Sequence, residues 1–409
     1  MAGARGAERV RLPRGGEFQA LWLGEAISVV GDQLAKVAVA MSVFDRTGSA
    51  AWTGAAYAAT FLAPLVAGPP LAGLADRFAR KPLMVTCLLL QMLCVSVIAI
   101  PWLPLGGVVA GVILVAAFQV PYKGAQGATV RVLLAGRPDG NDLTKAGRAR
   151  LTLVRELGQI AGLGGAAAVV LAIGSGAALA VDAVTFLLAA ILTQTGLRAR
   201  PAPMRQGGEL RHRPMAELRR QLRADPRLRR MFLLLALIGL TAAPDAVMVP
   251  LVADIGAPEW VVGPLLAADA VGVALTAAWL ERQSDGKATR LIVPLAVLSM
   301  APLATVAILP AHPAVLAILL VISGIGGAYI IPAIGEATQR VDDSIAGTTG
   351  GLISTVLRAS QGIGALAAGA LAQGFSPITA VAITGGVGMV LTGAFGIHWS
   401  RYPSQRRAG

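Results

Sequence analysis

Long apolar runs separated by short polar breaks make up most of the chain. A helix that crosses a bilayer needs about 20 predominantly apolar residues, and twelve such runs follow one another. The strict polar-apolar alternation that is typical of membrane barrels is absent. Backbone groups inside lipid must be paired within their own segment, so each run is predicted to be a helix. The runs are 18–44, 52–75, 83–103, 106–130, 151–172, 176–197, 231–252, 258–280, 290–310, 313–335, 348–372 and 377–399.

Composition supports a membrane protein. Of the 409 residues, 55% are apolar and 14% are charged, whereas about 25% of the residues in an average soluble domain are charged. A soluble fold of this length could not bury so much apolar surface. Cys87 and Cys94 lie seven residues apart in one run. On a helix this separates them by about 10 Å, too far for a disulfide. The predicted fold class is an all-α polytopic membrane protein with twelve transmembrane helices.

The positions of the basic residues predict the orientation. Thirty of the 35 Lys and Arg residues fall on the side that holds both termini. Cytoplasmic loops carry the excess of positive charge, so both termini are predicted to be cytoplasmic. The formal net charge of +13 then faces the anionic inner leaflet, which accounts for it without nucleic acid. The expected location is the plasma or inner membrane, with membrane lipids as partners.

A basic segment divides the twelve runs into two sets of six. Weak echoes at an offset of about 203 residues, such as Thr152 to Arg155 against Thr355 to Arg358, indicate two facing repeats. The predicted organisation is an N-tail (1–17), an N-terminal six-helix bundle (18–197), a cytoplasmic linker (198–230), a C-terminal six-helix bundle (231–399) and a C-tail (400–409).

The loop after the second run carries a recognisable motif. Residues 72–81, AGLADRFARK, resemble the loop signature Gly-x-Leu-Ala-Asp-Arg-x-Gly-Arg-Arg/Lys of the major facilitator superfamily. Residues 28–32, 47–49, 182–186 and 225–229 resemble elements of the branch that holds macrolide-efflux proteins and catecholate-siderophore exporters. The resemblance covers nearly the whole chain and implies the two-bundle major facilitator fold.

The sequence departs from the family pattern at several points. Alanine replaces both motif glycines, at Ala72 and Ala79, although Gly73 stands next to the first. The antiporter pattern Gly-Pro-x-x-Gly-Gly lacks its proline, since residues 162–165 read GLGG. Residues 123–127, KGAQG, resemble the superfamily's Arg-x-x-Gln-Gly element, but we give this short match no weight in choosing site residues.

The resemblance implies a conformational latch in the loop after the second run. Asp76 occupies the acidic motif position and can accept hydrogen bonds from a helix N-terminus, while Arg77, Arg80 and Lys81 supply cations. We expect this loop to favour the outward-facing state. The alternative is a basic cytoplasmic loop with one capping acid.

Ionisable residues inside the runs are the main candidates for chemistry, because charge at bilayer depth is costly. Glu25, Asp32 and Lys36 share one helix face, and Asp32 can pair with Lys36 one turn away. Asp245 and Asp269 lie in the seventh and eighth runs. These five residues are the proton-coupling candidates. For each, the alternative is a structural ion pair or hydrogen bond.

Other residues receive narrower predictions. Family architecture places the first, fourth, seventh and tenth helices around a cavity, so Phe118, Tyr122 and Tyr329 are candidate walls, with core packing as the alternative. Arg155, Glu156 and Arg358 are candidates for interdomain salt bridges. The three histidines do not form a metal constellation, and no phosphate-binding loop is present. We therefore expect no metal, no cofactor and no enzymatic activity.

These features together favour one function. We expect a secondary transporter, functioning as a monomer, that exports an amphipathic small molecule, such as a drug, a macrolide-like compound or a siderophore, in exchange for protons. One alternative is an importer or facilitator on the same fold. Another is a membrane sensor or assembly partner that transports nothing.

Overall fold

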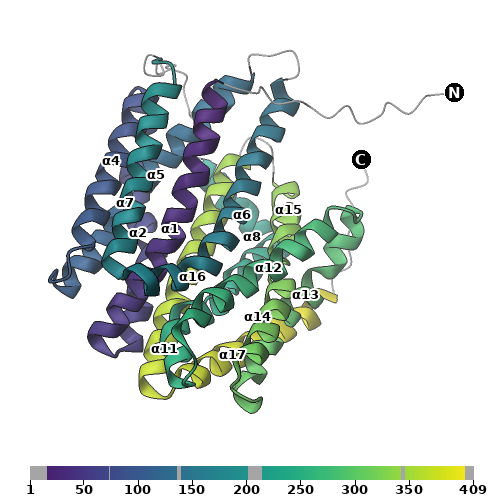
Figure 1. The fold of residues 1–409 in the computed structure, drawn as a ribbon. Coiled ribbons are helices and arrows are strands. Elements are labelled where there is room, and N and C mark those ends of the chain that lie inside the picture. The colour runs from purple at the N-terminus through teal and green to yellow at the C-terminus, as the bar shows by residue number, and fades with distance from the viewer. Residues whose placement is uncertain (1–15, 73, 136–139, 201–213, 342–345, 401–409) are drawn as a thin grey trace. The chain divides into compact units, whose positions relative to one another are not determined.

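The computed structural model describes residues 16–72, 74–135, 140–200, 214–341 and 346–400. Throughout these ranges the regular structure is helical, and Figure 1 shows coiled ribbons. Each of the twelve predicted runs coincides with a helix or with consecutive short helices. The prediction of an all-α polytopic fold is confirmed.

Length and hydropathy separate these helices into two groups. Within the described residues, nine segments are long and apolar enough to cross a membrane, and two shorter apolar helices cover Ala50–Val66 and Leu157–Ile173.

The helices of the first half are α1 (Glu17–Thr47), α2 (Ala50–Ala72), α3 (Leu74–Arg77), α4 (Arg80–Ile98), α5 (Leu105–Ala135), α6 (Gly140–Ile173) and α7 (Ser175–Gly196).

The second half contains more interruptions. The seventh run is divided into three helices by breaks at Leu237 and Ala242, and Pro244, which has no backbone N–H to continue the hydrogen-bond ladder, follows the second break. The helices are α8 (Pro214–Ala224), α9 (Pro226–Ala236), α10 (Ile238–Thr241), α11 (Ala243–Asp254), α12 (Val262–Leu280), α13 (Asp285–Thr305), α14 (Pro313–Gly327), α15 (Ile330–Gln339), α16 (Ala346–Gly374) and α17 (Pro377–Ser400), with short 3-10 turns at Glu259–Val261 and Val306–Ile308.

Two connections in the first half require glycine. Gly48, with φ +59°, separates α1 from α2, and Gly174, with φ +84°, separates α6 from α7. Residues with a Cβ are disfavoured in this left-handed region. These glycines allow consecutive long helices to reverse direction within one or two residues.

The chain forms two compact units. The first contains residues 1–35, 66–162 and 176–206. In this unit α4 packs beside α5, and α1 packs closely on α7, where Gly24 faces Ala189 and Gly196 faces Ala20. Arg200, just beyond α7, forms a bidentate ion pair with Glu17 at the start of α1, with N···O distances of 2.6 and 3.0 Å.

The second unit contains residues 36–65, 163–175 and 207–409. Helix α12 packs on α14, α13 packs on both α14 and α17, and α16 packs on α10 and α11. Helices α1, α2 and α6 each contribute one end to this unit, although they begin in or extend into the first.

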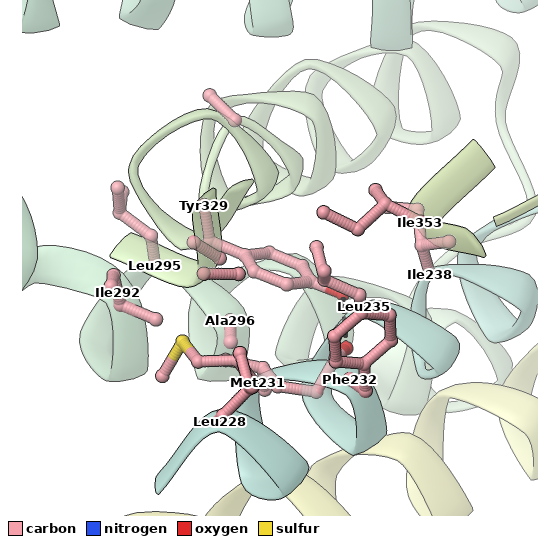
Figure 2. Close-up of a cluster of buried hydrophobic side chains, with 14 of the residues drawn as sticks. Leu228, Met231, Phe232, Leu235, Ile238, Ile292, Leu295, Ala296, Tyr329 and Ile353 are labelled. Atoms are coloured by element: carbon pink, nitrogen blue, oxygen red, sulfur yellow. Dashed lines mark hydrogen bonds between the residues drawn. The ribbon is translucent and has the colours of Figure 1, made fainter. Parts of the chain in front are cut away.

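The core of the second unit surrounds Tyr329, whose side chain is 0% exposed. Figure 2 shows its ring among side chains of α9, α13 and α16. The Tyr329 hydroxyl donates a hydrogen bond to the Leu234 main-chain oxygen at 3.0 Å. The one polar atom of this side chain is therefore satisfied inside the core.

Helix α8 docks on the same core. Leu218 is 0% exposed and belongs to the cluster around Tyr329, whereas Arg219, Arg220 and Arg223 are exposed on the opposite face. Asp225, between α8 and α9, caps the N-terminus of α9: its side chain accepts hydrogen bonds from the backbone N–H groups of Arg227 and Leu228. This cap fixes the start of α9.

Candidate functional site

Glu25 lies at the centre of a buried polar group in the first unit. Its side chain is 0% exposed on α1. Lys123 on α5 donates to both carboxylate oxygens at 2.6 Å, and Gln126, one turn further along α5, donates to Oε2 at 2.9 Å. A buried carboxylate is tolerated when it is paired and hydrogen-bonded in this way.

An aromatic side chain completes this group. The Gln126 amide also donates to the Tyr122 hydroxyl at 3.3 Å, and the Lys123 ammonium lies 5.3 Å from the centre of the Tyr122 ring. Lys123 is one-third exposed, unlike Glu25. The charge of Lys123 is therefore held between a carboxylate and an aromatic face, on a side chain that solvent or a ligand can still reach.

Asp32 lies two helical turns further along α1. Gln119 on α5 donates to its Oδ2 at a long 3.5 Å, and Asp182 on α7 lies within electrostatic range. Gly31, next to Asp32, leaves no room for a Cβ because the Asp182 and Thr185 side chains occupy that space. Helix α1 thus approaches α7 closely at Gly31, against the Asp182 side chain.

A second ionisable group lies in the second unit. The Tyr57 hydroxyl on α2 donates to Asp245 Oδ2 on α11 at 3.1 Å. Lys36 of α1 lies within electrostatic range of Asp245, and so does Asp269 of α12. The Tyr57 ring packs on Phe61, with centroids 5.3 Å apart. Three predicted coupling residues from distant sequence positions therefore share one region.

Several helices of the second unit approach one another so closely that backbone packs on backbone at glycine residues. A Cβ on Gly54 of α2 would lie 2.9 Å from the Gly369 Cα on α16. A Cβ on Gly263 would lie 2.7 Å from the Gly164 main-chain oxygen. The Ser49 hydroxyl donates to Gln373 Oε1 at 2.8 Å. The end segments of α2 and α6 are thus packed directly against the helices of the second unit.

The predicted latch loop is partly described. Asp76 lies in α3, but its side chain falls outside the described residues. Arg77 is exposed, and Arg80 and Lys81 are half-buried in the first turn of α4. Arg80 Nε is buried without a hydrogen-bond partner among the described residues.

The remaining predicted residues are scattered. The side chains of Arg155 and Glu156 fall outside the described residues, and Arg358 is exposed on α16. Phe118 is half-buried on α5, one turn before Tyr122, whereas Tyr329 belongs to the core described above. In the described part of the chain, no three His, Cys, Asp or Glu side chains are grouped so that they could hold a metal ion.

Lys123 and Gln126 are the site residues that sequence reasoning missed. Their signal was present, since both belong to the short segment that resembles the Arg-x-x-Gln-Gly element. Tyr57 was visible only as half of an aromatic pair with Phe61. Its bond to Asp245 joins residues 188 positions apart, for which the sequence carries no local signal.

Long apolar helices that can cross a membrane, with charged groups held inside them, define a class, the polytopic membrane proteins. The family profile of the Major Facilitator Superfamily matches residues 21–365. The chain belongs to this superfamily. A sequence search of curated proteins finds no match.

Solved structures agree on the fold. A point mutant of the nucleoside transporter NupG matches with a TM-score of 0.75 at 13% identity, covering 93% of this chain and 99% of that one. A peptide-bound POT family transporter gives 0.74 at 10% identity, covering 95% and 96%. A bacterial homolog of the human lysosomal transporter Spinster, inward-facing and unoccupied, gives 0.72 at 14% identity, covering 95% and 98%. At these identities the likeness shows the fold alone.

Proposed function

We propose that this protein is a proton-coupled exporter that moves an amphipathic small molecule by alternating access, functions as a monomer and performs no enzymatic chemistry. The observation that carries the proposal is the fully buried Glu25 carboxylate, ion-paired with Lys123 inside the membrane-spanning helices. A purely structural helix bundle has no need of such a group, because intramembrane charge is costly.

Protonation of Glu25 supplies the coupling step. A proton on the carboxylate removes its negative charge, so the attraction to Lys123 is lost. The Lys123 ammonium beside Tyr122 then loses its carboxylate partner, and its partly exposed side chain can move away from Glu25. A substrate that binds only while the Glu25–Lys123 pair is intact competes with the proton, so substrate binding releases the proton and protonation releases the substrate. Substrate and proton movements are thereby linked.

The second ionisable group gives a path for the conformational step. With the predicted cytoplasmic termini, residues 36–65 and 163–173 are the outer ends of their helices. Their direct backbone contacts with α12 and α16 then close the transport path on the external side. Opening this side requires the Tyr57–Asp245 bond and the Gly54–Gly369 contact to separate. Alternating access requires that these helix ends be packed together in one state and separated in the other.

The branch resemblance supports export and the type of cargo. The segments that resemble macrolide-efflux and siderophore-export proteins include Gly31, Asp32 and Asp182, and the Gly31 backbone lies against the Asp182 side chain. The aromatic side chains near Lys123 and Asp245 suit a cargo with both polar and apolar parts.

The experiment is dye transport in proteoliposomes at several imposed pH gradients. The probes are a fluorescent lipophilic cation and a neutral amphipathic dye. We expect gradient-driven transport by the natural protein and its loss in Glu25→Gln. Glu259→Gln, which changes an exposed glutamate, is the matched control and should behave normally. Transport by Glu25→Gln that follows the gradient as the natural protein does would refute the coupling role.

The latch loop belongs to the same proposal. If Asp76 stabilises one of two transport states, Asp76→Asn should impair transport while leaving membrane insertion intact. The lost charge-assisted hydrogen bond is worth about 1.5–3 kcal/mol, enough to shift a two-state balance more than tenfold. Normal transport by this variant would reduce Asp76 to a residue of the basic loop.

A further inference from the structure

The corner between α8 and α9 carries a large surplus of positive charge. Residues 214–230 contain six arginines and two carboxylates. Both carboxylates already have partners. Glu217 forms an ion pair with Arg220 at 2.7 Å, while Asp225 caps α9 and forms an ion pair with Arg340 at 3.3 Å. The proposed transport mechanism uses none of these residues.

Three of the six arginines are exposed and unmatched by a carboxylate. Arg219 and Arg223 lie one helical turn apart on α8, on the face opposite to buried Leu218. Arg229 is exposed on α9. In the part of the chain that the structure describes, none of the three forms an ion pair. Each guanidinium group can therefore hold a phosphate group of a partner by paired hydrogen bonds.

Packing holds this corner at the level of the lipid headgroups. The apolar segment Pro226–Asp254, which is long enough to cross a membrane, begins two residues after the end of α8. Leu218 and Leu222 of α8 pack on the same buried cluster as Met231 of α9, inside that segment. Helix α8 cannot leave the membrane surface without opening this core. Arg223, in the last turn of α8, therefore lies where the segment enters the bilayer.

The exposed face of α9 changes from basic to apolar within one turn. Leu233 follows exposed Arg229 by four residues and is 60% exposed. Positions four apart share one helix face, and the leucine lies about 6 Å further into the membrane. A cation above an exposed aliphatic side chain matches a phospholipid, whose phosphate lies above its acyl chains. A soluble anion would contact the arginine but would leave the leucine without a partner.

We propose that Arg219, Arg223 and Arg229 form a binding surface for anionic phospholipids in the leaflet beside α8, which the predicted topology makes the cytoplasmic leaflet. The lipid phosphates lie against the guanidinium groups, and an acyl chain lies along Leu233. The inference goes beyond the general attraction of basic loops to anionic lipid, because it assigns a local enrichment to three particular side chains. It does not depend on proton coupling, so a failure of dye export would leave it standing.

Quenching of a fluorophore at the corner by labelled lipids tests the inference. The fluorophore is attached to Ala224→Cys, at the exposed last residue of α8, in the full-length protein carrying Cys87→Ala and Cys94→Ala. The protein is reconstituted in phosphatidylcholine vesicles with a small fraction of doxyl-labelled phosphatidylglycerol or doxyl-labelled phosphatidylcholine. The ratio of the two quenching constants measures the enrichment of anionic lipid. We expect a ratio of about five or more, because one arginine at an anionic surface contributes about this factor.

The decisive variant combines Arg219→Gln, Arg223→Gln and Arg229→Gln, and should lower the quenching ratio to about one. The matched control removes three exposed basic residues near the start of α13, on the same predicted side of the membrane: Arg282→Gln, Lys287→Gln and Arg290→Gln. Lys287 and Arg290 lie on the face of α13 away from the core on which α8 packs. The control removes the same charge and should retain the ratio.

Equal loss of the ratio in both triple variants would show that only the total surface charge attracts the lipid, which would overturn the inference. Thermal unfolding in detergent should be nearly unchanged in both variants, because the replaced side chains are exposed. A ratio of about one in the natural protein would also refute the proposal.

Two further measurements separate lipid from soluble partners. Poly-glutamate or inorganic phosphate is added to the labelled protein in vesicles of phosphatidylcholine alone, and the fluorescence is followed. A response that requires the three arginines, without enrichment of phosphatidylglycerol, would assign the corner to an acidic protein segment or a free anion and would overturn the inference. Enrichment of phosphatidylglycerol without a response to either soluble anion supports it.

Discussion

At the scale of single residues, pairing decides which charges the membrane-spanning helices can hold. Glu25 is wholly buried, yet it receives three hydrogen bonds from Lys123 and Gln126. Such a pair stabilises little by itself, because both partners lose hydration. Its energetic importance appears when one partner is removed and the other charge remains buried.

Lys123→Met should therefore be strongly destabilising. It leaves the Glu25 carboxylate without its cation, at a cost of about 3–5 kcal/mol. The double variant Lys123→Met with Glu25→Gln removes both charges and should recover most of the lost stability. Thermal unfolding of the purified proteins in detergent measures the cycle. A double variant no more stable than Lys123→Met alone would contradict this view of the pair.

Partner identity at this scale could not be predicted from the sequence. The sequence selected Glu25, Asp32, Lys36, Asp245 and Asp269 because charge within apolar runs is rare. It offered Lys36 as the partner of Asp32 because one helical turn separates them. The partners of Glu25 and Asp245 lie 98 and 188 positions away along the chain, and tertiary packing alone brings them together.

At the scale of helices, most of the architecture could be predicted. Each predicted run is helical, since bilayer length and backbone pairing leave few alternatives. The division of the seventh run at Leu237 and Ala242 was not predicted. Pro244 indicated only a missing N–H, whereas Gly239 lies against the Ser360 and Gly364 backbone, a contact made in three dimensions.

Glycine contacts between helices should resist enlargement. Gly54→Ala places a methyl group against the Gly369 backbone, which cannot rotate away, and such overpacking costs about 1–3 kcal/mol. Gly351→Ala on α16 meets open space and should be neutral or stabilise its helix by up to about 1 kcal/mol. Thermal unfolding of both variants compares them. Equal unfolding temperatures for the two variants would mean that the contact between α2 and α16 accommodates the added methyl group without cost.

The α8 helix should respond to acid. Hydrogen bonds from Arg220, then from Gln221, lower the pKa of Glu217 from its ordinary value of 4.5. A lowered pKa in the folded state means that this contribution is present above pH 4.5 and is lost as the pH falls through the lowered pKa. Hydrogen exchange over residues 214–224 should increase below pH 4.5 and change less in Glu217→Gln. The effect should be small, because Glu217 faces water.

At the scale of the whole molecule, the positive charge of the loops predicts the orientation in the membrane. The described helices and the family show a multi-pass membrane protein, and the basic residues predict which side is cytoplasmic. Reporter fusions at Gly409 and within residues 198–230 should both report a cytoplasmic location. A fusion near His312 should report an external one. An external signal from the C-terminal fusion would overturn the predicted topology and the location of the closed side.

Helix α1 belongs to both compact units, with residues 17–35 in the first and residues 36–47 in the second. Asp32 stands at its midpoint, about 22 Å from either end at 1.5 Å per residue. A straight helix that tilts about its centre moves its two ends in opposite directions. We expect a change in packing at Asp32 to reach residues of both units through this one helix.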